Sequence, residues 1–346
     1  MIKLLHLSHI DLDGYGCQYL TSKYFKNINC YNANYGPEVT SRIKEIIYDI
    51  KKSQLFYPNQ EIMILITDLN LTPKESAWIE KEAKELDVGL QLLDHHATGQ
   101  TSADRYKWYH LDSSKSATLI TYNWLQNLYK FDEENTLLDV VKTINAIDIW
   151  LSDDKFFELG KVCLGMIAGS REINKIVFPD NDRAFKLFLI DSIQSVISKK
   201  DSNILLDDNL HSIKKEFFTD DKNDTKDNLV ASYITDLLGK DKDRFKIFYK
   251  NYKGVLGYNI GSSSIIGNRF LLDNPDYDFY MDISSRGSFS LRSNDKLDVS
   301  IMAQEIGNGG GHPNASGGKI EGFKNSFVYE KVKLAIVEHI KTKTIK

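Results

Sequence analysis

Apolar runs alternate with longer amphipathic stretches through the first half of the chain. The runs are apolar at successive positions, as in strands buried on both faces, and lie at 2–8, 27–33, 61–67 and 88–93. Helical spacing of apolar positions fills the intervals, at 14–25, 38–52 and 73–86. Thr72 and Pro73 supply the cap and first-turn residues of the last of these helices. This β-α-β-α order predicts a parallel sheet with helices on both faces.

The rest of the chain is predicted to mix helices and strands. Helical patterns occur at 115–129, 133–150, 262–272, 298–306 and 324–342, and strand patterns at 253–260, 277–284 and 287–293. Residues 218–228 hold one large apolar side chain, which indicates a solvated segment. We therefore predict an α/β protein with an N-terminal parallel-sheet domain (1–185), a charged helical linker (186–235) and a smaller C-terminal α/β domain (236–346).

Length and composition fit a two-domain globular protein. The 346 residues exceed the size at which one core usually stops growing, and 42% of them are hydrophobic. The 44 basic and 48 acidic residues give a net charge of -4, which argues against a protein that coats DNA regardless of sequence. Three scattered cysteines, Cys17, Cys30 and Cys163, predict no disulfide framework and favour a reducing cytoplasm. The apolar start is typical of a first strand rather than a signal peptide, and we predict no membrane span.

Titratable side chains follow three of the predicted strands. In chain order they are His9, Asp11 and Asp13, then Asp68, then Asp94, His95 and His96. The carboxyl ends of parallel strands share one edge of a sheet, which is where ligands bind in this class of fold. Each cluster alone is typical of a turn, a helix cap or a polar loop. Three clusters on one edge indicate a common site.

Clustered carboxylates repel one another unless cations lie among them. Carboxylates with imidazoles and no thiolate suit Mn²⁺ or Mg²⁺, although imidazole also accepts Zn²⁺, Fe²⁺ or Co²⁺. Six or more candidate ligands exceed the needs of one ion, and a carboxylate can bridge two ions about 4 Å apart. We therefore predict two divalent cations bridged by Asp68, with Mn²⁺ preferred and Mg²⁺ or Co²⁺ as alternatives.

A glycine-rich segment at 306–318 follows a predicted helix. Glycines let a backbone approach a ligand closely and direct N–H groups at anionic oxygens. The polar residues within this segment favour a binding site over the alternative, a flexible surface loop; they are His312, Asn314 and Ser316. The strand before it has a polar face formed by Arg286, Ser288, Ser290 and Arg292. That face is either simply solvated or presents guanidinium groups to phosphate.

The segment 239–254 is basic and contains four aromatic residues. Phe245, Phe248, Tyr249 and Tyr252 recur at helical spacing, so we predict that most of them face the core. The alternative for the basic side chains is one edge of a nucleic-acid channel.

The motifs resemble those of a known family, the DHH phosphoesterases with a DHHA1 second domain. The name-giving motif is Asp94-His95-His96, and "GGGHPNASGG" resembles the DHHA1 substrate loop. The first-strand motif "SHIDLDGYGC" resembles in particular that of NrnB-type oligoribonucleases, or nanoRNases. The resemblance covers nearly the whole chain and is weakest across 180–250.

The resemblance implies a role for each candidate residue. One metal would be held by His9, Asp11 and Asp68, and the other by Asp13, Asp68, His95 and Asp148. Asp148 matches the fourth acidic ligand of the family, with Asp112 as a weaker alternative. His96 would face the reacting phosphate, with Asp94 orienting an imidazole. The substrate would be gripped by Arg286, Arg292, Gly309, Gly310, Gly311, His312 and Asn314.

Two departures from the wider family bear on these roles. Related exopolyphosphatases and class II pyrophosphatases separate the first His and Asp by three residues, whereas here only Ile10 intervenes. Those pyrophosphatases also carry a lysine- and arginine-rich motif that this chain lacks, which disfavours pyrophosphate as a substrate.

The expected activity is metal-dependent 3′-to-5′ hydrolysis of short RNA to nucleoside 5′-monophosphates. The alternatives are hydrolysis of linear or cyclic dinucleotides or of 3′-phosphoadenosine 5′-phosphate, and a nucleotide-binding module whose metals are only structural. Expected partners are short RNA oligonucleotides or dinucleotides, with no membrane, and a homodimer is left open.

Overall fold

The computed structural model describes residues 2–129, 135–220 and 223–344 and divides into two compact units. The N-terminal unit comprises 1–170 and 183–213, and the C-terminal unit comprises 171–182 and 214–346. The limits predicted above, 1–185, 186–235 and 236–346, stay predictions. Within the stretch predicted as a linker lie the second half of α8 (Pro179–Ser192), all of η2 (Ile193–Ser195) and α9 (Ser202–Phe218), and the larger part of α10 (Lys226–Lys240).

The N-terminal unit is built on a five-stranded parallel sheet in the order β2-β1-β3-β4-β5. The strands are β1 (Lys3–Ser8), β2 (Ile28–Asn32), β3 (Ile62–Thr67), β4 (Gly89–Asp94) and β5 (Tyr109–Leu111). The helices between them are α1 (Leu12–Tyr24), α2 (Pro37–Phe56), α3 (Pro73–Glu85), η1 (Ala97–Gly99) and α4 (Gln100–Ala103). The sequence predicted the first four strands and three of these helices, and β5 was missed because three residues are too short to show a period.

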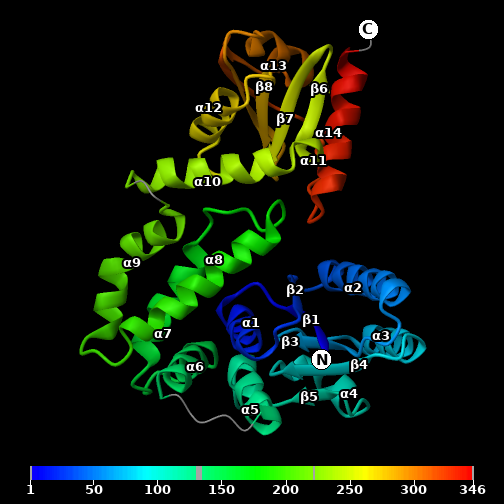
Figure 1. The fold of residues 1–346 in the computed structure, drawn as a ribbon, viewed down its shortest axis with the longest axis vertical. Helices are drawn as coiled ribbons and strands as arrows, with labels where there is room; N and C mark the ends of the chain where they lie inside the picture. The colour runs from blue at the N-terminus through cyan, green and yellow to red at the C-terminus, as the bar shows by residue number, and fades with distance from the viewer. Residues whose placement is uncertain (1, 130–134, 221–222, 345–346) are drawn as a thin grey trace. The chain divides into compact units, whose positions relative to one another are not determined.

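Helices cover both faces of this sheet, as predicted (Figure 1). On one face, Ile43, Ile46 and Ile79 from α2 and α3 pack with Ile64, Ile66 and Leu92 of the strands. On the other, α1 and α5 (Ala117–Tyr129) lie against β1 and β4 and against each other. The unit also contains α6 (Asn135–Asp148), α7 (Phe157–Gly169), η2 and most of α8 and α9. Thr72 caps α3 through a reciprocal hydrogen-bonded pair with Glu75, as the sequence predicted.

The C-terminal unit contains a six-stranded mixed sheet in the order β10-β11-β9-β8-β7-β6. Its strands are β6 (Lys246–Tyr249), β7 (Tyr252–Tyr258), β8 (Phe279–Ile283), β9 (Ser288–Ser293), β10 (Gly310–His312) and β11 (Ala315–Lys319). The helices are α10, α11 (Lys242–Phe245), α12 (Ser263–Asp273), α13 (Val299–Gly307) and α14 (Tyr329–Thr344). Only β7 and β8 pair in parallel.

The helical prediction for 239–254 is wrong beyond Phe245. Residues 246–249 and 252–258 form the β6–β7 hairpin, with Ile247 and Tyr249 buried and Phe248 54% exposed. Aromatic residues at positions 245, 249 and 252 fit one face of a helix. Buried and exposed side chains nevertheless alternate along 246–249, as they do in a β-strand. Four of the six basic side chains of this segment are paired with acids, namely Arg244 with Glu330, Lys246 with Asp243, Lys250 with Glu305 and Lys253 with Asp276. This pairing weakens the case for a nucleic-acid channel edge.

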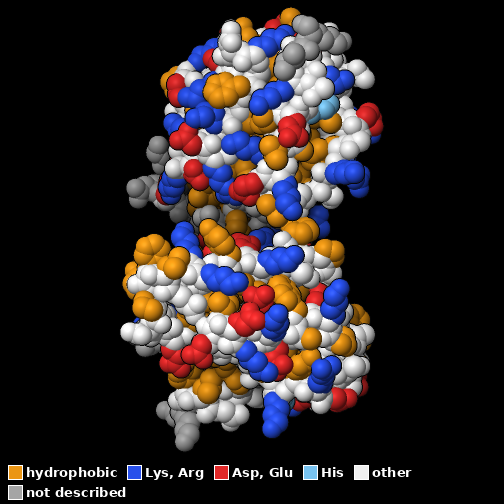
Figure 2. All heavy atoms as spheres, turned by 90° about the vertical axis from the view of Figure 1, so that its right-hand side faces the viewer, with side chains coloured by type: hydrophobic (Ala, Val, Ile, Leu, Met, Phe, Trp, Pro, Cys, Tyr) orange, Lys and Arg blue, Asp and Glu red, His pale blue; other side chains and the backbone are white. Residues whose placement is uncertain are grey.

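The surface shows mixed charge. Basic and acidic side chains are interspersed over the described residues of the face in Figure 2, in keeping with the net charge of -4. Within the described residues, every helix is too short or too polar to span a lipid bilayer.

Candidate metal centre

The carboxyl edge of the N-terminal sheet brings the predicted clusters together. His9 follows β1, Asp68 follows β3, and His95 and His96 follow β4. Asp148 reaches the same place as the last residue of α6. Because the strands are parallel and adjacent, their carboxyl ends converge as the sequence predicted.

His9, Asp11 and Asp68 form one group of potential metal ligands, with one donor atom from each within 4.8 Å of the others. His9 Nδ1 lies 2.8 Å from Asp11 Oδ2 and 3.6 Å from Asp68 Oδ2. By their geometry these contacts are not hydrogen bonds. His9 Nδ1 and Asp68 Oδ2 are therefore buried without a hydrogen-bond partner. Donor atoms that converge without bonding one another are the arrangement expected around a shared cation.

Asp13, His95 and Asp148 form a second group of the same kind. His95 lies between the carboxylates: its Nε2 is 3.9 Å from Asp13 Oδ2 and its Nδ1 is 3.5 Å from Asp148 Oδ2. Asp148 Oδ2 is buried without a hydrogen-bond partner. The Asp112 carboxylate is instead bonded to Ser114 and Lys115, which favours Asp148 as the acid of this group.

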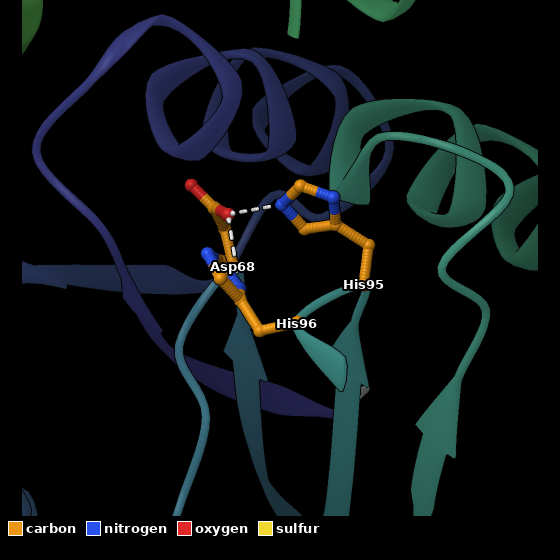
Figure 3. Close-up of side chains that lie close together, drawn as sticks. All are labelled: Asp68, His95 and His96. Carbon is orange, nitrogen blue, oxygen red and sulfur yellow. Dashed lines mark ion pairs between the residues drawn. The ribbon is translucent and has the colours of Figure 1, made fainter. Parts of the chain in front are cut away.

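Asp68 lies between the two groups. Its Oδ1 is 3.3 Å from His95 Nε2 and 4.0 Å from His96 Nδ1 (Figure 3). Its Oδ2 lies 3.6 Å from His9 Nδ1. The two carboxylate oxygens of Asp68 are thus directed to different imidazoles. This placement is the one required of a bridging ligand.

The backbone of Asp68 is left-handed, with φ of 56°. Aspartate tolerates this conformation better than most residues, and the Asp68 amide is fixed by donating to Leu93 O on the next strand, at 3.1 Å. Below it, Thr67 Oγ1 contacts His6 Nε2 at 2.8 Å and Ser8 Oγ at 2.7 Å. Burial lowers the pKa of His6 to about 3, so this ring stays neutral. The buried polar network therefore holds the residue before Asp68.

Asp13 is held by the amino end of α5. Its two carboxylate oxygens accept hydrogen bonds from the backbone amides of Ala117, at 2.7 Å, and Thr118, at 2.8 Å. A helix amino terminus favours a negative charge, so α5 keeps this buried carboxylate in place. Asp11 is held in a similar way by the amino end of α1. It is the N-cap of that helix, and its carboxylate accepts a hydrogen bond from Gly14 N at 3.0 Å.

The electrostatics of the cluster show a deficit of positive charge. Burial, followed by the charges of Asp13 and Asp11, raises the pKa of Asp68 well above its usual range. Burial and the Asp13 charge likewise raise the pKa of Asp148 to about 9. Burial opposes protonation of His9, yet the acids Asp11 and Asp68 raise its pKa to about 10. Divalent cations among these side chains would remove the repulsion, so the residues present fit a metal centre.

Asp94 does not join the potential ligands but holds His96. Its Oδ1 lies 2.7 Å from His96 Nδ1, and its Oδ2 accepts a hydrogen bond from the Tyr109 hydroxyl at 2.8 Å. Gly99 leaves room for this arrangement, since a Cβ there would lie 2.0 Å from the Tyr109 hydroxyl oxygen. The glycine that ends the "LDHHATG" run therefore admits the tyrosine that orients the acid.

Sequence reasoning missed Asn34, Tyr35 and Tyr109. The Tyr35 hydroxyl is 2.9 Å from His96 Nε2 and its ring lies 4.4 Å from that of His9, while Asn34 Oδ1 is 3.4 Å from His9 Nε2. Asn34 and Tyr35 follow β2, so the carboxyl-end rule applied to the second predicted strand would have found them. Tyr109 begins the strand that the sequence did not reveal.

The predicted substrate residues lie in the C-terminal unit. Ser288, Ser290 and Arg292 share the polar face of β9, with Phe289 and Leu291 buried on the other, as predicted. The Arg292 guanidinium donates to Leu291 O at 2.7 Å and to the Ser264 hydroxyl. The prediction that Arg286 shares this strand face is wrong, because β9 begins at Ser288 and Arg286 lies exposed in the turn between β8 and β9.

The glycine-rich segment is a β-hairpin, β10–β11, rather than an irregular loop. Gly309 is required by close packing, because a Cβ there would lie 2.1 Å from Gly317 O, and Gly311 adopts a φ of 143°. Gly310 and His312 are exposed. The Asn314 side chain bonds Asp295 through both ends of its amide, at 2.9 and 2.6 Å, so it fixes the hairpin end.

Comparisons with known proteins agree with the fold. Residues 262–341 match the DHHA1 domain. A 3′,5′-cyclic-nucleotide phosphodiesterase of Helicobacter pylori is 42% identical over 98% of this chain and 99% of its own. A crystal structure of an uncharacterized protein from Helicobacter pylori is 40% identical with a TM-score of 0.91, covering 99% of this chain and 100% of that one. An uncharacterized protein of Acanthamoeba polyphaga mimivirus is 45% identical over 20% of this chain and 18% of its own.

The fold and the site define a phosphoester hydrolase, with an α/β domain that carries the acidic centre and a separate DHHA1 domain. The chain belongs to the DHH/DHHA1 family of phosphoesterases, and its function is of the phosphodiesterase type. Members of this family use divalent metals, and the buried Asp and His groups described above could bind them.

Proposed function

We propose that this protein is a metal-dependent phosphodiesterase that hydrolyses 3′,5′-cyclic nucleotides to nucleoside 5′-monophosphates. The observation that carries the proposal is the 42% identity over 98% of the chain to a protein named for that activity. The converging carboxylates and imidazoles supply a centre suited to the chemistry.

Seven side chains have roles in the proposed reaction. His9, Asp11 and Asp68 would hold one cation, and Asp13, His95 and Asp148 the other, with Asp68 shared. When bound, the two cations supply an attacking water of lowered pKa and positive charge beside the phosphoryl oxygens. His96 lies beside them with its Nε2 toward the Tyr35 hydroxyl.

The reaction breaks the bond between phosphorus and the ribose 3′-oxygen. The water oxygen forms a bond to phosphorus, and the water's proton is balanced by protonation of the departing 3′-oxygen. His96 Nε2 is the atom we assign to proton delivery, because Asp94 occupies Nδ1 at 2.7 Å, and Nε2, which contacts the Tyr35 hydroxyl at 2.9 Å, is the other ring nitrogen. Arg292 and the β10–β11 hairpin are assigned to binding the phosphate and the nucleoside.

Short oligoribonucleotides are the second candidate substrate. The first-strand motif, with His9, Asp11 and Asp13, resembles that of oligoribonucleases. Cleavage from the 3′ end of RNA also breaks a bond to a 3′-oxygen and also releases a 5′-monophosphate. One centre could therefore serve both substrates, and the C-terminal unit would decide between them.

A direct comparison of substrates tests the proposal. Purified protein with Mn²⁺, Mg²⁺ or Co²⁺ would be given 3′,5′-cyclic AMP, 2′,3′-cyclic AMP, a labelled RNA five-mer, pGpG and 3′-phosphoadenosine 5′-phosphate. We expect 5′-AMP from 3′,5′-cyclic AMP and no such product from the 2′,3′ isomer, with the Asp11→Asn variant as a control for contaminating activity. Cleavage of RNA alone would favour the second candidate. Nucleotide binding without turnover under any metal would refute both.

A further inference from the structure

A cavity of about 330 Å³ lies in the N-terminal unit, lined by residues that have no part in the metal centre. Its walls are the face of β4 and β5 opposite the α2–α3 side and one side of α5. Leu93 and His110 are neighbours on the sheet face, and Gln91 lies two residues before Leu93. The size is at the lower end of the range for small-molecule sites, which suits a single nucleotide rather than an oligomer.

The α5 side of this cavity is unusual in its chemistry. Ile120, Asn123, Trp124 and Asn127 follow one another at i, i+3, i+4 and i+7, so they share one stripe of the helix. A stripe that faces a sheet is normally apolar, yet here two of four members carry carboxamides. Within the described residues, the side chains of Asn123 and Asn127 make no hydrogen bond to another protein group. Asn123 is half-buried and Asn127 is exposed, so both carboxamides on this wall are free to donate to and accept from a polar ligand.

The charges at the cavity are predominantly positive. Lys107 and Lys115 line it against a single carboxylate, that of Asp112, which pairs with Lys115. Lys107 is exposed and has no ion-pair partner among the described residues. His110 is a further donor at the same wall. An anionic group of the ligand would therefore be held at this end.

We propose that this cavity binds a nucleoside monophosphate, separately from the metal centre. The phosphate lies at Lys107 and Lys115, and the base edge is hydrogen-bonded by Asn123 and Asn127. Trp124, half-buried, provides an aromatic surface for the base. This inference does not depend on which phosphodiester the centre hydrolyses, because it rests only on the lining of the cavity.

Photocrosslinking of the metal-loaded full chain with 8-azido-AMP tests the proposal. Labelled peptides identified by mass spectrometry should include residues between Lys107 and Asn127, apart from any label near His95. The double variant Asn123→Ala/Asn127→Ala and the single variant Lys107→Ala should lose this label and bind 5′-AMP at this site about tenfold more weakly by calorimetry. Both asparagines lie in helix α5, and alanine has a higher helix propensity than asparagine, so folding should be retained.

Matched controls make the outcome decisive. Lys81→Ala, which removes an exposed lysine of α3, should leave the label unchanged. Excess 5′-AMP should compete fully, and adenosine or inorganic phosphate only in part. Absence of label between Lys107 and Asn127, or label that persists in the double variant, would overturn the proposal, as would full competition by inorganic phosphate alone.

Discussion

The Asp94 carboxylate lies 2.7 Å from His96 Nδ1, a contact made between two residues of the same short segment. Since an ionised carboxylate can only accept, this contact places a proton on Nδ1 and directs Nε2 away from Asp94. Tyr109 donates to the second oxygen of Asp94, at 2.8 Å, and so prevents the acid from turning. Asp94 therefore orients the His96 ring, and Tyr109 keeps Asp94 in place.

Loss of this acid should lower turnover without removing the metals. Asp94→Asn removes the negative charge and replaces one of the two acceptor oxygens with an NH₂ donor, so it should reduce kcat by about 10- to 100-fold, the usual cost of disturbing such an orienting partner. Tyr109→Phe should produce a smaller loss in the same direction. Metal content by mass spectrometry should be unchanged in both variants, while the pH profile of kcat shifts. A normal pH profile in Asp94→Asn would contradict the positioning role.

Replacement of the bridging carboxylate should abolish activity while leaving the fold intact. Asp68→Asn keeps a residue that accepts the left-handed backbone, and it should reduce kcat by more than about 100-fold because a ligand is lost rather than its support. In EDTA its melting temperature should equal or exceed that of the wild type, since a repelled buried charge is removed. Asp87→Asn is the control, with a φ of 52° at an exposed position. Full activity in Asp68→Asn would exclude the bridging role.

The metal-free protein should lose stability as the pH rises. The pKa of Asp148 is raised from 3.8 to about 9 by burial and neighbouring acids, so its contribution is complete below 3.8 and is lost as the pH rises through about 9. His9, with a pKa raised from 6.5 to about 10, acts in the same direction at higher pH. Asp11, with a pKa lowered to about 2, contributes above 3.8 and matters only in acid. Thermal melts in EDTA across this range measure the effect.

Divalent metal should reverse this trend, because cations replace the protons on the clustered ligands. The rise in melting temperature on adding Mg²⁺ should be larger near pH 9 than near pH 6. Asp148→Asn should flatten the dependence in EDTA, since the group whose pKa is raised to about 9 is gone. Equal metal effects at both pH values would contradict a centre made of these groups.

A side chain at Gly99 should disturb the centre by displacing Tyr109, which orients Asp94. In Gly99→Ala the new Cβ would lie 2.0 Å from the Tyr109 hydroxyl oxygen and 3.4 Å from Asp94 Oδ2, so the tyrosine must move. We expect a loss of about 1 to 3 kcal/mol in the free energy of unfolding, together with reduced kcat. Gly165→Ala is the matched control, because a Cβ there meets nothing within 4 Å and should stabilise α7 by up to about 1 kcal/mol. Denaturant unfolding distinguishes the two.

Removing the guanidinium of Arg292 should weaken substrate binding. A charge-assisted contact to phosphate is worth about 1.5 to 3 kcal/mol, so Arg292→Ala should raise KM by about 10- to 100-fold with little change in metal content. Arg292→Lys should restore part of the loss. Arg269→Ala, an exposed arginine of α12 paired with Asp273, should have no effect. An unchanged KM in Arg292→Ala would remove this residue from the binding site.

The sequence by itself determined the parallel sheet and the identity of the side chains at its carboxyl edge. Buried strands need continuous apolar runs, and four of the five strands of the N-terminal sheet have them. The clusters after β1, β3 and β4 then had to meet, because parallel neighbouring strands end side by side. Asp148 carried no such signal, and it was identified only through the family resemblance.

The tertiary structure decided what local patterns leave ambiguous. Strands β5 and β10 have three residues each and are too short to show a period, and β11 is too rich in glycine to show one. The aromatic spacing at 245–252 fits a helix as well as the hairpin that forms. Contacts such as Tyr109 with Asp94, or α5 with Asp13, join segments far apart in the chain. Such contacts depend on packing between elements, and no pattern within one element records which distant partner it will meet.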